Sequence, residues 1–405
     1  MVKDSTGNFS GLVTLEEKAG VIVIGGHFQG LGLLRSLGRQ DIPVYLLDKE
    51  QCIGRFSKYV KKFLKCPDVS KDESRFLEFL VNLAGKENLE GWIIYPNDDE
   101  TVSFLARHRE RLEKHYRVST PPWDIVKYAY DKALTYGIAE KCGVAIPKTY
   151  YPQSIDELKQ TDMAFPVVIK PSIKEPFYSR TSRKAILVKD RDQLIKEYNG
   201  ALKAIASSQT LMVQEFIPGG TKNLLSVGCL CRDGKLLARV MASRLRQHPM
   251  DFGHATTFAK TVNIPEMGEM AGKILAAIKF HGLAEIEFMY DSRDSRYKLI
   301  EINARPWGWH TIAMAAGVDM PYLSYLDMLG REVRQNGFIE GVKWMHLATD
   351  VPTAAIEILK GRMKLSEYIS SLKGKKQYAV WSREDPVPFF AELVLLPYLW
   401  IKRGF

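Results

Sequence analysis

The chain has 405 residues, 46% of them hydrophobic and 26% charged, which is typical of a globular protein with two or three domains. Its five cysteines are irregularly spaced, which excludes a disulfide scaffold and favours a reducing compartment. The net charge of +10 suits anionic partners such as nucleotides, nucleic acids or lipid surfaces without choosing among them. No apolar run reaches the roughly 18 residues of a membrane span, and the N-terminal segment lacks the apolar centre of a secretory signal. We therefore expect a cytoplasmic protein.

The first part of the chain alternates between strand and helix patterns. A short apolar run at 21–24 is followed by helical apolar spacing, and residues 43–48 supply a second strand. The order repeats at 92–95, where a strand precedes an amphipathic helix whose acidic residues at 98–100 favour a helix N-terminus. These βαβ repeats predict a doubly wound, Rossmann-like α/β domain over residues 1–118.

The glycines that follow the first strand do not form a dinucleotide-binding motif. Gly25, Gly30 and Gly32 miss the G-x-G-x-x-G spacing, which disfavours a nicotinamide or flavin cofactor. They indicate a tight connection between strand and helix, or a turn whose backbone amides bind some other anion.

The pattern changes after the two prolines at 121–122. Residues 129–143 predict a helix that ends at Gly143 and is followed by a strand. The apolar strand FPVVIKPS at 165–172 carries Lys170 near its end, where the ammonium either reaches solvent or points into a cleft at an anion. Downstream we expect a helix near 190–206, strands at 210–216 and 224–232, and a hairpin partner at 235–241 after Asp233-Gly234.

Two β-like runs with acidic residues at alternating positions flank the polar turn DSRDSR at 291–296. An antiparallel hairpin centred on Asp294 places Glu287 opposite Glu301 and Glu285 opposite Asn303. Two facing carboxylates repel each other unless a cation lies between them, and Mg²⁺ prefers such oxygen ligands. The alternative is a solvent-exposed sheet face on which an arginine neutralises the carboxylates.

The order of these motifs resembles a known family. A strand-end lysine, the segment QEFIPGG at 214–220 and the strand EINARP at 301–306 follow a Rossmann-like domain, and this stretch, from about residue 20 to 330, resembles the ATP-grasp superfamily. The resemblance is specifically to its carboxylate-amine ligase-like members. It implies an α/β and α+β protein with a Rossmann-like domain over 1–118, an ATP-grasp domain of two α+β subdomains over 119–330 with its lid at about 146–216, and a C-terminal extension over 331–405.

The resemblance also implies site residues and cofactors. The expected cofactors are ATP and Mg²⁺, with Mn²⁺ as an alternative metal. Arg305 would stabilise the charge that develops on the transferred phosphoryl group. The implied metal ligands are Glu287, Glu301 and Asn303, and the implied nucleotide contacts are Lys132 and Lys170 at the phosphates and Gln214, Glu215, Phe216 and Ile217 at the adenine.

The sequence departs from the family pattern in two places. The acidic residue that often binds the ribose is replaced by Lys222 and Asn223. The glycine-rich flap over the phosphates is also missing, and a basic segment stands in its place. Its side chains either close over the phosphates or form a solvated loop; they are Lys174, Arg180, Arg183 and Lys184.

The chemistry implied by the resemblance is amide or peptide-like bond formation. Transfer of a phosphoryl group from ATP makes an acyl-phosphate from a carboxylate, and an amine attacks it with release of ADP and phosphate. We expect small-molecule carboxylate and amine substrates and no nucleic acid, because no basic-aromatic recognition motif is present. An ATP-binding protein without turnover and an ATP-dependent carboxylase are the alternatives. The candidate substrate contacts are Arg244, Arg246 and His248 for a carboxylate and Asp98 or Asp99 for an amine.

The C-terminal segment 386–405 is apolar and aromatic with a basic end. It is too short to span a bilayer, and Pro397 predicts a break in any helix there. We expect it to dock on the protein's own surface, or else to contact a membrane surface or a partner subunit.

Overall fold

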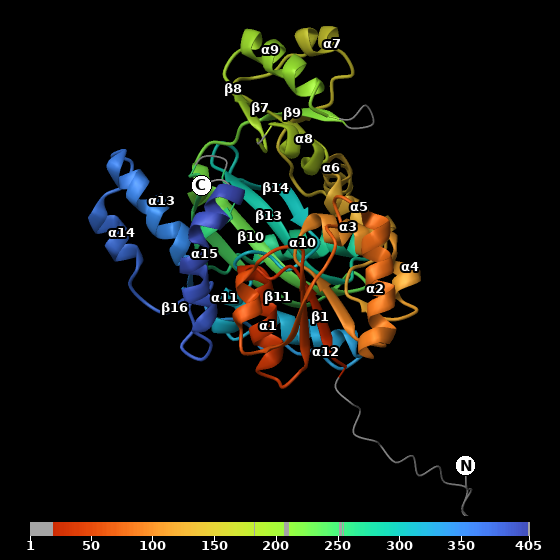
Figure 1. Cartoon of the computed structure of the whole chain (residues 1–405). Coiled ribbons are helices and arrows are strands. Elements are labelled where there is room, and N and C mark those ends of the chain that lie inside the picture. The colour runs from red at the N-terminus through yellow and green to blue at the C-terminus, as the bar shows by residue number, and fades with distance from the viewer. Residues whose placement is uncertain (1–18, 182, 206–209, 251–252, 254, 404–405) are drawn as a thin grey trace, which may run out of the picture.

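Three β-sheets organise the protein, and in Figure 1 the lid sheet stands at the top, above the central sheet and the N-terminal domain. The described residues contain no helix that is long and apolar enough to cross a bilayer. The computed structural model describes residues 19–181, 183–205, 210–250, 253 and 255–403, without the side chains of 174–176, 179 and 399–403.

The N-terminal sheet is parallel and has the strand order β3-β2-β1-β4-β5, which confirms the predicted doubly wound architecture. Its central strand β1 is buried along its whole length, because helices cover both faces of the sheet. The elements are β1 Val21–Ile24, α1 Phe28–Gly38, β2 Val44–Asp48, the 3₁₀ turn η1 Ile53–Phe56, β3 Val60–Lys65, α2 Glu73–Glu87, β4 Ile93–Pro96, α3 Asp99–Arg107, α4 Arg109–Leu112 and β5 Arg117–Val118.

The connection from β1 to α1 is tight, as the glycines predict. Gly25 has a φ of +97°, and a Cβ atom on Gly30 would collide with the carbonyl oxygen of Gly25. The amide of Gly26 donates a 2.7 Å hydrogen bond to the carboxylate of Asp48 at the end of β2. The anion bound by this turn is therefore one of the protein's own side chains.

The lid contains a four-stranded antiparallel sheet with the order β6-β9-β7-β8. One prediction for the stretch before it is wrong, because the helix is divided at Asp131, which caps the second half. The strand expected after Gly143 is the short β6. The elements are α5 Trp123–Tyr130, α6 Lys132–Lys141, β6 Thr149–Tyr150, α7 Ile155–Gln160, β7 Val167–Pro171, α8 Lys174–Thr181, β8 Ile186–Val188, α9 Arg191–Leu202 and β9 Leu211–Glu215.

The central sheet has seven strands in the order β14-β13-β10-β11-β12-β15-β16. Helix α10 covers part of one face, and the N-terminal domain packs on the other through a core that includes Trp307. The last two strands come from the region beyond residue 330, so that region extends the same sheet. The elements are η2 Gly220–Asn223, β10 Leu224–Arg232, β11 Lys235–His248, β12 Ala255–Thr261, α10 Pro265–Ala277, β13 Gly282–Asp291, β14 Arg296–Asn303, α11 Thr311–Ala315, α12 Met320–Met328, β15 Lys343–Met345 and β16 Lys376–Tyr378.

Three further helices follow β15: α13 Leu347–Leu359, α14 Leu365–Ser371 and α15 Val387–Arg403. The predicted break at Pro397 is wrong, because α15 continues through it. Because proline has no N–H group, the carbonyl of Leu393 receives no helical hydrogen bond from residue 397. Leu393 and Pro397 are both exposed, so water can bind that carbonyl. One side of α15 docks on the protein, as predicted, through Phe389 and through Glu392, which pairs with His346 at 2.8 Å.

Candidate active site

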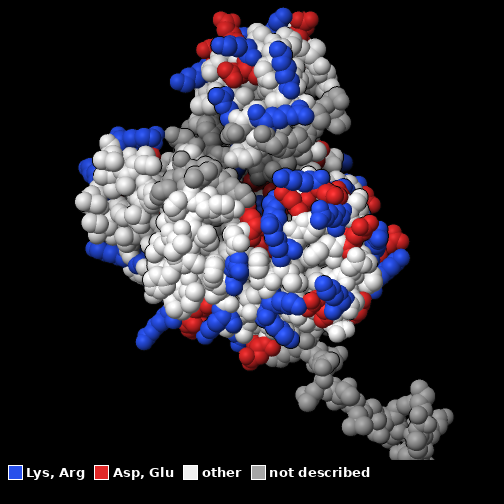
Figure 2. All heavy atoms as spheres, viewed as in Figure 1, with Lys and Arg blue, Asp and Glu red and all other residues white. Residues whose placement is uncertain are grey.

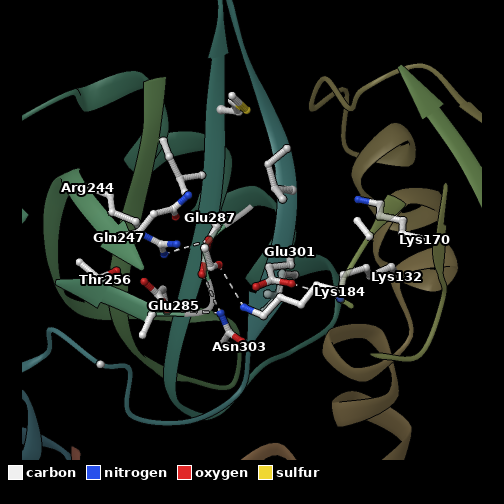
Figure 3. Close-up of a pocket in the computed structure, with 18 of the residues that line it drawn as sticks. Lys132, Lys170, Lys184, Arg244, Gln247, Thr256, Glu285, Glu287, Glu301 and Asn303 are labelled. Atoms are coloured by element: carbon white, nitrogen blue, oxygen red, sulfur yellow. Dashed lines mark hydrogen bonds and ion pairs between the residues drawn. The ribbon is translucent and has the colours of Figure 1, made fainter. Parts of the chain in front are cut away.

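A cleft of about 420 Å³ opens between the lid and the central sheet. This volume lies in the usual range for small-molecule sites. Figure 3 shows acidic side chains on the hairpin strands in the middle, with Lys132 and Lys170 on one side and Arg244 on the other. The N-terminal domain contributes Phe28 and Asp99 to the lining, so all three parts of the molecule meet here.

The hairpin β13–β14 carries the acidic residues of the cleft. Glu287 pairs with Glu301, and Glu285 pairs with Asn303, as the sequence predicts. The turn itself is centred half a residue earlier than predicted, because Asp291 pairs with Arg296. A register shift between these two regions leaves Ile300 unpaired, as a β-bulge.

The bulge decides which side chains of β14 face the cleft. Leu299 pairs with Phe288 and lies in the core, whereas Glu301, two residues later, pairs with Glu287 in the cleft. In a regular strand, residues two apart share one face. The extra residue therefore brings Glu301 onto the same face as Glu287.

Each of the two facing carboxylates has a basic partner. Arg244 lies 3.0 Å from Glu287, and Lys132 lies 3.1 Å from Glu301. The side-chain amide of Asn303 donates to Glu287 at 3.2 Å. This is the arrangement that two opposed carboxylates require, since each repels the other unless positive charge is close.

The donor set at this point fits Mg²⁺. Glu287 and Glu301 present carboxylate oxygens, which hard divalent cations prefer, and they leave room for water and phosphate oxygens as further ligands. Asn303 directs its NH₂ group to Glu287 and its oxygen to Arg305, so its amide would have to turn over to add an oxygen ligand. Within the described ranges there is no group of three or more His, Cys, Asp and Glu side chains that could cage a metal ion.

Glu285 lines the cleft, although sequence reasoning gave it only a place in the register. Its carboxylate accepts hydrogen bonds from the indole of Trp309 at 2.7 Å and from Asn303 at 3.3 Å. Burial, and then the charge of Glu287, raise its pKa. The alternation of two glutamates in AEIEF was the available signal, since residues two apart share a strand face.

Lys170 is buried at the end of β7 and lines the cleft. Its ammonium donates a 2.7 Å hydrogen bond to the hydroxyl of Tyr136, which in turn donates at 2.9 Å to the carbonyl of Ile300. A continuous chain of hydrogen bonds thus joins β7 to the bulge in β14.

The predicted hinge segment leaves β9 at the edge of the cleft. Gln214 donates to Thr149 at 2.7 Å, and the amide of Phe216 donates to the carbonyl of Pro166 at 3.2 Å. The Glu215 carboxylate accepts the amide of Lys148 at 2.9 Å, where a regular ladder would use the Glu215 carbonyl instead. Ile217 is buried in the cleft wall.

Arg305 connects the hairpin to the N-terminal domain. Its guanidinium donates to both carboxylate oxygens of Asp99, at 2.6 and 3.4 Å, and to the side-chain oxygen of Asn303 at 3.3 Å. Burial lowers the pKa of Arg305, but Asp99 and other carboxylates outweigh this effect and raise it overall. The predicted neighbour Asp98 instead caps α3 by accepting the amide of Thr101 at 2.7 Å.

Two of the three predicted substrate residues on β11 lie outside the cleft. Arg246 forms two 2.8 Å bonds with Asp350, and His248 lies 2.9 Å from the hydroxyl of Thr353, so both hold α13 against the sheet. Register shifts on either side of Arg246 break the alternation that would have put it on the same face as Arg244.

Only part of the basic segment that replaces the glycine-rich flap lies in the cleft. Lys184 lines the cleft and donates to the carbonyl of Gly253 at 3.3 Å. Arg183 pairs with Glu197 at 3.8 Å, and Arg180 is exposed. The side chain of Lys174 lies outside the described residues.

The pattern of a family described as "ATP-grasp in the biosynthetic pathway with Ter operon" matches residues 207–349. The chain contains an ATP-grasp domain. This finding confirms the resemblance drawn from the sequence, and the matched stretch includes the whole acidic hairpin.

The chain is 23% identical to D-aspartate ligase of Enterococcus faecium (strain Aus0004) over 305 residues, which are 70% of each protein. Its fold is similar to that of a biotin carboxylase from Campylobacter jejuni in a β,γ-ATP complex, with a TM-score of 0.65, 15% identity and coverage of 80% and 74% of the two chains. The fold is also similar to that of an L-amino acid ligase from Bacillus licheniformis, with a TM-score of 0.59 and 15% identity over 79% and 75% of the two chains.

Proposed function

We propose that the protein is an ATP-dependent ligase that joins a small-molecule carboxylate to an amine. The observation that carries the proposal is the pairing of Glu287 with Glu301 across a cleft that also holds Lys132 and Lys170. A site of this kind concentrates oxygen ligands for a metal and cations for phosphates in one place. Both are what phosphoryl transfer asks of a protein.

The nucleotide would lie between the lid and the central sheet. Lys132 and Lys170 would bind its phosphates, and the base would lie against Gln214, Phe216 and Ile217. The carbonyl of Glu215 is the natural acceptor for the adenine amino group, because its own carboxylate has taken the Lys148 amide.

Glu287, Glu301 and Asn303 would hold Mg²⁺, or Mn²⁺ in its place, which when bound neutralises the phosphates during transfer. Arg305 is fixed by Asp99 beside Asn303, so its charge is oriented before the reaction starts. We assign it the stabilisation of charge on the transferred group.

The two substrates would bind where the hairpin faces the N-terminal domain. Glu285 accepts from two neutral donors, and the ammonium form of an amine bound beside it would favour its charged form against the burial that raises its pKa. Arg244 can bind the carboxylate substrate once Glu287 takes a metal as its partner. We do not assign substrate roles to Arg246, His248 or Asp98, whose side chains serve other contacts.

The proposed reaction has two steps. A carboxylate oxygen of the acid attacks the γ-phosphorus, the bond to the β-phosphate oxygen breaks, and ADP leaves. The amine nitrogen attacks the acyl carbon, phosphate leaves with the C–O bonding electrons, and the nitrogen loses a proton. No side-chain nucleophile is needed.

A screen of amino acids and small carboxylates for substrate-dependent ADP release, with mass detection of the product, tests the proposal. Hydroxylamine in place of the amine traps an acyl-phosphate as a hydroxamate whatever the natural amine is. Glu301→Gln is the negative control. ADP release without any hydroxamate or amide would contradict carboxylate activation.

An ATP-dependent carboxylase is the second candidate, because the fold is also similar to that of biotin carboxylase. Isotopic bicarbonate separates the two functions, since only a carboxylase transfers the label into its product, which is assayed in alkaline solution because N-carboxylates lose CO₂ in acid. ATP binding with no turnover on any substrate pair would leave the third alternative, a binding protein.

A further inference from the structure

The exposed large apolar side chains are concentrated in one part of the molecule. Of the fifteen that the described residues contain, eleven lie between Val351 and Tyr398. This segment is a minor part of the chain, so the concentration is not what scattered surface hydrophobics would give. The eleven are Val351, Ile356, Leu359, Leu365, Ile369, Trp381, Val387, Phe390, Leu393, Val394 and Tyr398.

Helix α13 is polar inside and apolar outside. Its buried side includes Asp350, which binds Arg246, and Glu357, which binds Arg362. Its outer side carries Val351 and Leu359, and Leu359 is 87% exposed. A helix that only served the protein's own core would have the opposite polarity.

The neighbouring helices repeat this feature. In α15 the buried Glu392 binds His346, whereas Phe390 and Val394, one helical turn apart, are 57% and 80% exposed. In α14, Leu365 and its one-turn neighbour Ile369 are both exposed. All three helices therefore direct an apolar stripe outwards.

The same region is basic at its surface. Figure 2 shows a largely uncharged area over α13, α14 and α15, with Lys and Arg side chains around it. The exposed cations include Lys360, Lys364 and Lys373. Most of the acidic residues of these helices are instead buried against internal partners, as Asp350, Glu357 and Glu392 are.

We propose that this surface, formed by α13, α14 and α15, docks on an anionic lipid membrane. Apolar side chains surrounded by lysines match the acyl region and the acidic headgroups of such a surface. A symmetric contact with a second copy would bring the same basic edges together, where they repel. The charge pattern therefore favours the lipid.

Sedimentation with phosphatidylcholine vesicles, with and without phosphatidylglycerol, tests the proposal on the full chain. We expect the protein to sediment with the anionic vesicles, and added salt to weaken binding by about tenfold. The double variant Leu359→Asp, Val394→Asp should lose this binding. Both positions are so exposed that the fold is unaffected, which a thermal melt verifies.

Ile339→Asp is the matched control, because Ile339 is 54% exposed but lies outside the three helices. It should bind vesicles as the wild type does. The proposal is overturned if the wild type does not sediment with anionic vesicles, or if the double variant still binds them. Light scattering that shows a dimer, dissociated by the double variant, with no vesicle binding would also overturn it.

Discussion

Tyr136→Phe removes one oxygen atom from the only described route of hydrogen bonds between Lys170 and the carbonyl of Ile300. Tyr136 is fully buried, so water cannot simply replace the hydroxyl. The half-buried carbonyl of Ile300 left without a donor costs up to about 1–3 kcal/mol, and the lost bond to a charged group adds to this cost. Because the cleft admits some water near Lys170, we expect a total of about 2 kcal/mol in the free energy of unfolding.

The same substitution should also weaken ATP binding. Without its acceptor, Lys170 can adopt other rotamers, and the bulge that directs Glu301 into the cleft loses one of its supports. We expect a loss of affinity of about tenfold, equivalent to about 1.4 kcal/mol. Urea unfolding measures the first effect and calorimetric titration with ATP and Mg²⁺ measures the second.

Tyr150→Phe is the matched control, because Tyr150 also donates to a carbonyl, that of Asp162, but at an exposed site. It should change stability by less than about 0.5 kcal/mol and leave ATP affinity alone. If Tyr136→Phe behaves like this control in both assays, the hydrogen-bond chain does not position the site.

Four other substitutions test the remaining assigned roles. Glu301→Gln should lower turnover by about a hundredfold or more even at saturating Mg²⁺, since it removes a charge from the proposed metal site; steady-state ADP release checks this. Lys170→Ala should weaken ATP binding about tenfold, whereas Arg305→Ala should cost about a hundredfold in turnover and little in ATP affinity; calorimetry beside ADP release separates the two, and equal losses of ATP affinity would contradict the assigned roles. His281 hydrogen-bonds Asp327 at 3.1 Å, which raises its pKa above 6.5, so its stabilisation is present below that pH and is lost as the pH rises through the folded-state pKa. The thermal midpoint of the wild type should therefore fall more steeply from pH 6 to 8 than that of His281→Asn.

Strand alternation and one turn were enough to predict the acidic pairs of the hairpin. The positions of Glu287 and Glu301 relative to the polar turn give their pairing directly. The error in the turn centre was hidden because the bulge at Ile300 corrects it by one residue. Tyr136, on a helix far away in the chain, donates a hydrogen bond to the carbonyl of that bulge, and no local sequence pattern predicts such a contact.

The substrate residues on β11 could not be predicted for a related reason. Arg244, Arg246 and His248 alternate in the sequence, which favours one shared face. Register shifts in β11 and the docking of α13 turn the last two away from the cleft. The second cause depends on residues about a hundred positions later, Asp350 and Thr353.

The ion pairs of the cleft explain why so many charges can be buried there together. Arg244 with Glu287, Lys132 with Glu301 and Arg305 with Asp99 cancel one another in the protein alone, so the acidic hairpin stays assembled without a ligand. A metal ion at the two glutamates would take over the neutralisation of both carboxylates. Lys132 and Arg244 would then be free for anionic groups, phosphate in one case and a carboxylate in the other. Metal and substrate binding would then be coupled through the same side chains, and each should strengthen the other.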